Sequence, residues 1–100
     1  MVKHVVMWKL KDQAEENDKS INKQRIKDLL FDLKSSIPEI ITLEIGDNFN
    51  QSPAAADLAL ITAHKNKETL SGYINHPSHK KVAEYIRKVV KDRTVVDFEY

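Results

Sequence analysis

Two strand-like segments with apolar side chains on both faces constrain the fold of this chain more than any other feature. They are VKHVVMWKL at residues 2–10 and LALITAH at residues 58–64. In the first segment, the two-residue period of a strand places Trp8 on one face and Val5 and Met7 on the other. A nearly continuous apolar run is typical of a strand that is covered on both sides. Both segments therefore predict strands in the interior of an assembly.

Three other segments have the apolar period of helices. One helix is expected from about Asp18 to Ser36, where Pro38 ends it, and a short one in NKETLSGYIN, which Pro77 breaks. Another is expected in SHKKVAEYIRKVVKD. The two long helices carry apolar stripes of Ile26, Leu29, Leu30, Leu33 and Ile37, and of Val82, Tyr85, Ile86, Val89 and Val90.

The order of these segments predicts an α+β fold. IITLEIGDNF alternates as a second strand, and TVVDFEY closes the chain as a fourth, with Val96, Phe98 and Tyr100 on one side. The resulting order, βαββαβ, is that of a ferredoxin-like protomer with an antiparallel four-stranded sheet, formed by one domain over residues 1–100. The helices can cover only one face of such a sheet. We therefore expect a second copy to cover the other face, which gives a homodimer.

Composition excludes several kinds of site and partner. Sixteen basic and 15 acidic residues give a net charge of +1, which favours neither nucleic acid nor an anionic membrane as a partner. The absence of cysteine removes disulfides and thiolate metal sites. Because the apolar start of the chain is interrupted by Lys3, His4 and Lys9, it is too polar for a membrane span, and we expect a cytoplasmic protein.

The segment GYINHPSHKK at residues 72–81 holds the residues best suited to acid–base chemistry. His79 is expected in the first turn of the last helix, where the helix dipole disfavours imidazolium and keeps a neutral base available. Next to Pro77, His76 is suited to bonding a free backbone amide at the helix junction. A tyrosine and a histidine in such a segment can equally be structural, and His4 can be a hydrogen-bonded core residue.

Three stretches resemble the stress-responsive α/β-barrel domain family, often called Dabb. They are VKHVVMWKLKD at the start, SIPEI after the first helix and YINHPSHKKVAEYIRKVVKDRTVVDFEY at the end. The resemblance covers essentially the whole chain and implies a ferredoxin-like protomer that pairs into a dimeric α+β barrel. Many members are known only as stress-responsive proteins. One plant member is a polyketide cyclase that closes a linear poly-β-keto chain by aldol chemistry without metal or organic cofactor.

Carried over by position, the resemblance implies that Tyr73 and His79 form an acid–base pair and that His4 lines the same pocket. A histidine base and a tyrosine hydroxyl would together support proton abstraction next to a carbonyl. Leu30 and Leu58 stand where the cyclase has a pocket tyrosine and a pocket histidine, which makes the pocket more apolar. With Trp8, these leucines are the predicted contacts of a small apolar carbonyl compound.

No cofactor is expected apart from a structural magnesium ion, which the resemblance implies at the backbone carbonyls of Lys34, Ile37 and Ile40. Carbonyls at a helix C-terminus carry partial negative charge and suit a hard cation. A zinc site of His4, His76 and His79 is less favoured because HPSH lacks the one-turn helical spacing of a metalloprotease motif.

Three functions remain open at this stage. The first is a cofactor-free lyase or cyclase that uses His79 as base and Tyr73 as acid. The second is a binding protein for a small apolar compound, with the same pocket and no reaction. The third is a non-catalytic, stress-linked protein whose useful property is a stable dimer.

Overall fold

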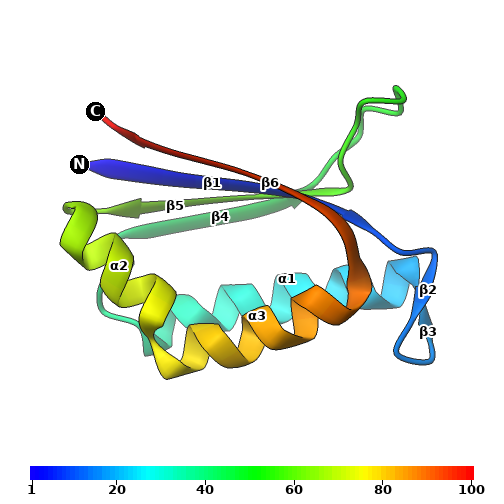
Figure 1. The fold of residues 1–100 in the computed structure, drawn as a ribbon, viewed down its shortest axis with the longest axis horizontal. Coiled ribbons are helices and arrows are strands. Elements are labelled where there is room, and N and C mark those ends of the chain that lie inside the picture. The colour runs from blue at the N-terminus through cyan, green and yellow to red at the C-terminus, as the bar shows by residue number, and fades with distance from the viewer.

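The computed structural model describes all 100 residues and contains the predicted four-stranded antiparallel sheet. The strands are β1 (Val2–Leu10), β4 (Thr42–Asp47), β5 (Leu58–His64) and β6 (Val90–Glu99), in the order β4-β5-β1-β6. The two central strands are β1 and β5, which are the two segments with apolar residues on both faces. The ferredoxin-like fold class is therefore confirmed (Figure 1).

All three helices lie on one side of this sheet, as Figure 1 shows. They are α1 (Lys19–Ser36), α2 (Lys67–Asn75) and α3 (Pro77–Val89). None of them is long and apolar enough to cross a membrane. We call the side of the sheet under the helices the covered face and the other side the open face.

The ends of the helices follow from local side-chain chemistry. Asp18 caps α1 by accepting a 3.0 Å hydrogen bond from the backbone N–H of Ile21. The helix ends at Ser36, two residues before Pro38, as predicted. At the start of α2, Asn66 and Thr69 form a reciprocal capping box.

Two local features differ from the sequence-based expectation. The polar connection after β1 contains a small hairpin of β2 (Gln13–Ala14) and β3 (Asn17–Asp18), whose turn residues Glu15 and Glu16 have positive φ. The prediction that Val90 continues the last helical stripe is wrong. Val90 begins β6 and pairs with Leu10 beside a register shift in β1, because the sheet offers this β-branched residue a ladder partner.

The two faces of the sheet differ in burial. The core lies between the covered face and the helices, and includes Val6, Trp8, Ile26, Leu30, Leu60 and Ile86. On the open face, Met7, Val96, Phe98 and Tyr100 are 37–59% exposed. The sequence placed Val96, Phe98 and Tyr100 together, and the structure confirms that they share this face.

Candidate functional site

Tyr73, in the second half of α2, is the centre of the candidate site. Its side chain is fully buried, and its hydroxyl is the one buried side-chain polar atom without a hydrogen-bond partner. Burial raises the pKa of Tyr73 to about 12, against a smaller opposing effect of the Arg93 charge. The hydroxyl is thus protonated at neutral pH and has a proton to donate to a ligand.

Three histidine rings surround Tyr73. The ring centroids of His79, His64 and His4 lie 4.6, 5.1 and 5.9 Å from that of Tyr73. The sequence predicted two of these neighbours, since His4 and His79 were expected in one pocket.

His79 lies in the first turn of α3, as predicted, and its ring nitrogens have different roles. The Nδ1–H group donates a 3.0 Å hydrogen bond to the carbonyl of Ile74, so Nε2 keeps the lone pair of the neutral ring. Burial lowers the pKa of His79, and the neighbouring basic side chains of His4, Arg93 and Arg87 lower it further against the raising effect of the Ile74 carbonyl. His79 is therefore neutral near pH 7 and can act as a base.

His4 is held by a carboxylate from the neighbouring strand. Its Nδ1 lies 2.5 Å from Oδ1 of Asp97, and the two residues face each other in the β1–β6 register. A carboxylate on Nδ1 fixes the orientation of the ring and leaves Nε2 for other contacts. This pairing fits a positioning role for His4 at the edge of the Tyr73 ring.

His64 has a structural role, because both of its ring nitrogens are engaged. Nδ1 donates to the carbonyl of Glu39 at 2.8 Å, and Nε2 accepts from the hydroxyl of Thr62 at 2.8 Å. Burial lowers the pKa of His64, which keeps the ring neutral. The ring thereby ties β5 to the loop after α1 and supports one side of Tyr73.

A cavity of about 300 Å³ lies between the covered face and the helices, and Tyr73 lines it. We call it the tyrosine cavity. The structure brings five of the predicted site residues to its wall, together with two arginines that were not predicted. They are His4, Trp8, Leu30, Tyr73 and His79, and the arginines are Arg87 and Arg93.

The other predicted residues lie elsewhere. Leu58 is fully buried but is absent from the wall of the tyrosine cavity. His76 ends α2 and accepts a 3.1 Å hydrogen bond at Nδ1 from the backbone N–H of Ser78, which is the junction role expected for it. No three histidine, cysteine or acidic side chains converge in an arrangement that could hold a metal ion.

The magnesium prediction concerns backbone carbonyls at the end of α1 and in the loop after it. There the carbonyl of Ile37 accepts a 3.2 Å hydrogen bond from the backbone N–H of Ile40, which uses one of its two lone pairs. The second lone pair of the Ile37 carbonyl has no hydrogen bond of this kind and is available to a cation. This carbonyl therefore fits the predicted magnesium site. The site stays a prediction.

Sequence reasoning missed four residues of the site, for different reasons. Asp97 and His64 become informative only when β1 is placed between β5 and β6. Arg87 had a weak signal, because it follows His79 by eight residues on one helix face and shares that face with Val82 and Ile86. Arg93 had none, since the strand start was predicted at Thr94.

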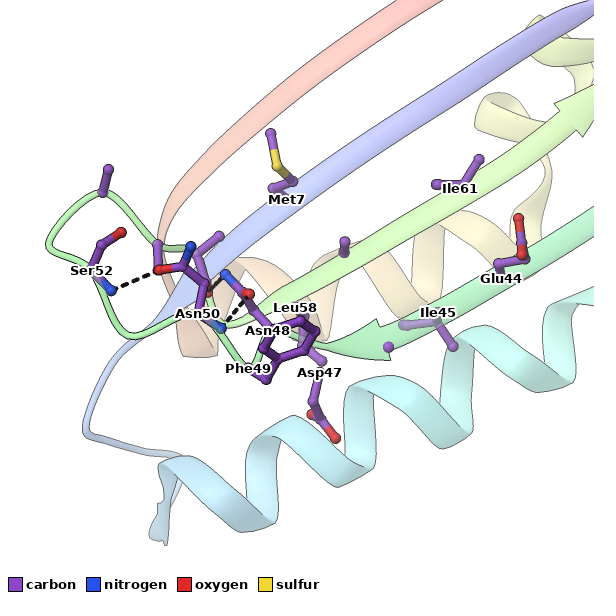
Figure 2. A pocket seen from close by; sticks show the side chains of 15 residues that line it. Met7, Glu44, Ile45, Asp47, Asn48, Phe49, Asn50, Ser52, Leu58 and Ile61 are labelled. Carbon is purple, nitrogen blue, oxygen red and sulfur yellow. Dashed lines mark hydrogen bonds between the residues drawn. The ribbon is translucent and has the colours of Figure 1, made fainter.

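A second and larger hollow, of about 670 Å³, lies on the open face beside the loop at residues 48–57. Figure 2 shows Met7 and Ile61 on the side of the sheet away from α1, and Phe49 in the loop. Two hydrogen bonds from backbone N–H groups, of Asn50 to Asn48 Oδ1 and of Ser52 to Asn50 Oδ1, brace the loop. This hollow contains no histidine or tyrosine, and its charged side chains are those of Glu44 and Asp47.

Comparison with solved structures shows the same fold in proteins of several organisms. A dimeric protein of unknown function from Bacteroides fragilis is 28% identical, with a TM-score of 0.85 over 99% of this chain and 95% of that one. A Dabb family protein from Mesorhizobium loti is 17% identical, with a TM-score of 0.73 over 99% and 95%. The hydroxynitrile lyase of Passiflora edulis is 13% identical, with a TM-score of 0.82 over 97% and 90%.

A search of curated proteins gives no match. The family comparison is decisive by contrast. The model of the stress responsive A/B barrel domain, Dabb, matches residues 2–100, which is nearly the whole chain. It agrees with the resemblance of the strand around His4 and of the Tyr73–His79 segment. The chain therefore belongs to the Dabb family of stress-responsive A/B barrel domains.

Proposed function

We propose that the tyrosine cavity binds a small apolar carbonyl compound and moves a proton at the carbon next to its carbonyl group. One observation carries this proposal, which is the buried Tyr73 hydroxyl without a partner. An unsatisfied buried polar group costs about 1–3 kcal/mol of stability. A ligand oxygen that accepts a hydrogen bond from this hydroxyl would remove that cost.

The proposed reaction uses two residues of the cavity. Nε2 of His79 takes a proton from the carbon next to the carbonyl, and the electron pair of the C–H bond forms a C=C bond as the carbonyl π electrons move to oxygen. The Tyr73 hydroxyl donates a hydrogen bond to that enolate oxygen, which stabilises the charge that develops there. His4, held by Asp97, orients the substrate.

Such an enolate can be reprotonated or can attack a second carbonyl, and the second course is an aldol ring closure of the cyclase type. The mainly apolar wall around Trp8 and Leu30 favours a substrate with a hydrocarbon or aromatic body. One neighbour of the same fold is named a hydroxynitrile lyase. At 13% identity its likeness concerns the fold, so it supports lyase chemistry for this chain only as a precedent.

We also propose that the chain works as a homodimer that pairs through the open face. Four large apolar side chains of this face are at least one-third exposed in the protomer, and a second sheet would cover them. Several structures of the same fold are described as dimeric. The tyrosine cavity lies on the covered face, so each protomer would keep its own site.

The magnesium site is a third proposal, with Lys34, Ile37 and Ile40 as carbonyl ligands. The ion would supply no chemistry to the tyrosine cavity and would stabilise the turn after α1. Addition of millimolar MgCl2 to chelator-treated protein is expected to raise the melting temperature by a few degrees. An unchanged melting temperature would remove the ion from the proposal.

Deuterium exchange tests the proposed function. The protein is incubated in D2O with a small ketone such as 2-octanone, and deuterium incorporation next to the carbonyl is followed by ¹H NMR. We expect wild-type protein to accelerate exchange, and Tyr73→Phe to reduce the acceleration by about 10²–10³-fold, as for loss of one oxyanion donor. His79→Ala is expected to abolish it.

Tyr85→Phe is the matched control, because the Tyr85 hydroxyl already donates to Asn22 Oδ1 at 2.9 Å and does not line the tyrosine cavity. Its exchange rate should equal that of the wild type. Ketone binding without accelerated exchange would indicate a binding protein that does not catalyse the proton transfer. Equal rates in all four proteins would refute the assignment of His79 and Tyr73.

A further inference from the structure

We infer that the carbonyl compound bound in the tyrosine cavity also carries a carboxylate, and that Arg87 and Arg93 bind this group. The inference rests on the proposed function, since it names the substrate class of the same site. It concerns two residues that neither the family resemblance nor the acid–base pair explains.

The two arginines are charged groups without a protein partner. Arg87 and Arg93 line the cavity, and neither takes part in any of the seven ion pairs of the structure. Arg25 provides a contrast, because its guanidinium lies 4.9 Å from the centroid of the Tyr85 ring and is engaged there. Both cavity arginines are exposed residues, so their guanidinium groups can meet a ligand as it enters.

The wall of the cavity contains no negative charge to balance them. None of its 12 residues is an aspartate or a glutamate. The carboxylate of Asp97 on β6 is already bound to His4. The positive charge of Arg93 acts on the pKa of both Tyr73 and His79, which places the guanidinium within electrostatic reach of the proposed chemistry. A cavity of this kind attracts anions and holds them against apolar walls.

The chemistry of the side chains favours a carboxylate over other anions. A guanidinium group presents a planar fork of N–H donors that matches two carboxylate oxygens. The remaining wall is mostly apolar, with 8 hydrophobic residues of 12. A volume of about 300 Å³ fits a small body rather than a large conjugate.

The spacing of His79 and Arg87 along α3 limits the distance between the carbonyl and the carboxylate of the ligand. His79 and Arg87 are eight residues apart on α3, which corresponds to roughly 12 Å along its axis. The long arginine side chain shortens the span that a ligand must cover. Keto acids that separate the carbonyl and the carboxylate by different numbers of methylene groups therefore measure the distance between the two ends of the site.

Calorimetric titration with matched ligands tests the inference. The probes are 4-oxopentanoate, 6-oxoheptanoate and 8-oxononanoate, each compared with its neutral amide. We expect at least one acid to bind about 10-fold or more tightly than its amide, with a preference that weakens as salt rises. Arg87→Gln and Arg93→Gln should each reduce this preference, and Arg25→Gln should leave it unchanged.

The outcomes separate this inference from the proposed function. Equal binding of acid and amide, with both weakened by Tyr73→Phe, would overturn the carboxylate and keep the carbonyl site. An acid preference that survives Tyr73→Phe but is lost in the arginine variants would keep the carboxylate and remove the role of Tyr73. Binding of none of the probes, or displacement of the acid by an equal concentration of inorganic phosphate, would overturn the inference.

Discussion

The two faces of the sheet differ in the polarity of the side chains that they bury or expose. The covered face buries three polar side chains, His4, His64 and Thr62, and all three are satisfied by neighbours on β5, β6 or the loop after α1. The open face leaves apolar side chains such as Val96 and Phe98 in contact with solvent. One face therefore has polar groups inside, and the other has apolar groups outside.

This contrast indicates that the faces serve different purposes. A buried polar network is kept only when its members are bonded, and the interior between the covered face and the helices meets this requirement everywhere except at the Tyr73 hydroxyl. A group of exposed apolar side chains on one face of a sheet is typical of an interface between chains. We therefore assign binding and chemistry to the covered face and assembly to the open face. The following changes test that division.

The largest effect is expected from a charge placed on the open face. Val96 is half exposed in the protomer and pairs with Val5 of the central strand β1 on this face. Val96→Asp would bury an unpaired carboxylate between two sheets, so we expect the dissociation constant of the dimer to rise at least about 100-fold. Sedimentation velocity would then show a species near 11.5 kDa.

Phe31→Asp is the matched control for that change. Phe31 is 65% exposed and lies on α1, on the helix side of the molecule. This variant should stay dimeric. If Phe31→Asp dissociates the dimer while Val96→Asp does not, assembly uses the helix layer and the division between the faces fails.

A second, smaller effect is expected from the two partly or fully buried tyrosines of the helix layer. Tyr73→Phe removes a hydroxyl without a partner, so we expect the free energy of unfolding to rise by about 1 kcal/mol. Tyr85→Phe removes the hydrogen bond to the buried Asn22, so we expect a decrease of about 1–2 kcal/mol. Urea denaturation of both variants measures the difference. A decrease of similar size in both would show that the Tyr73 hydroxyl has a structural partner after all.

A structural feature of either face can be predicted from the sequence when it depends on residues that are close together in the chain. The period of apolar residues, the end of α1 before Pro38 and the junction at His76 each depend on a few neighbouring residues, and all three were predicted. The contrast between the faces was also visible, because strand alternation separates Trp8 from Met7 without any knowledge of partners.

The chemistry of the site was harder to predict because it depends on register. His4 meets Asp97 across 93 positions of sequence, and His64 meets the carbonyl of Glu39 across 25. A shift of β6 by one residue would turn Asp97 to the open face. Leu58 shows a different limit of sequence reasoning, since this position taken from family resemblance is buried in the core and does not line the tyrosine cavity of the protomer.

A third effect concerns acid, and it involves two histidines on the helix side of the sheet. Burial lowers the pKa of His64 and of His79 below the usual 6.5. As the pH falls below 6.5, the unfolded chain therefore binds protons before the folded one, and the free energy of unfolding falls. The slope is at most about 1.4 kcal/mol per pH unit for each histidine. Urea denaturation between pH 7.5 and 5 should show this loss, and His79→Asn should make it shallower. An identical pH dependence in wild type and His79→Asn would contradict the assignment.

The smallest effect is expected from the two glycines, one on each side of the division. Neither has a positive φ, so alanine is allowed at both positions. A Cβ at Gly46, on the open face, would meet no atom within 4 Å, and Gly46→Ala should stabilise the protomer by about 0.5–1 kcal/mol. A Cβ at Gly72, beside Tyr73, would lie 3.0 Å from Oε2 of Glu39, so that side chain must move and the gain should be smaller. Thermal unfolding at low protein concentration compares the two variants. A loss of stability in Gly46→Ala that grows with protein concentration would indicate that the added Cβ meets the second copy in the dimer. It would place the backbone of that copy in close contact with β4.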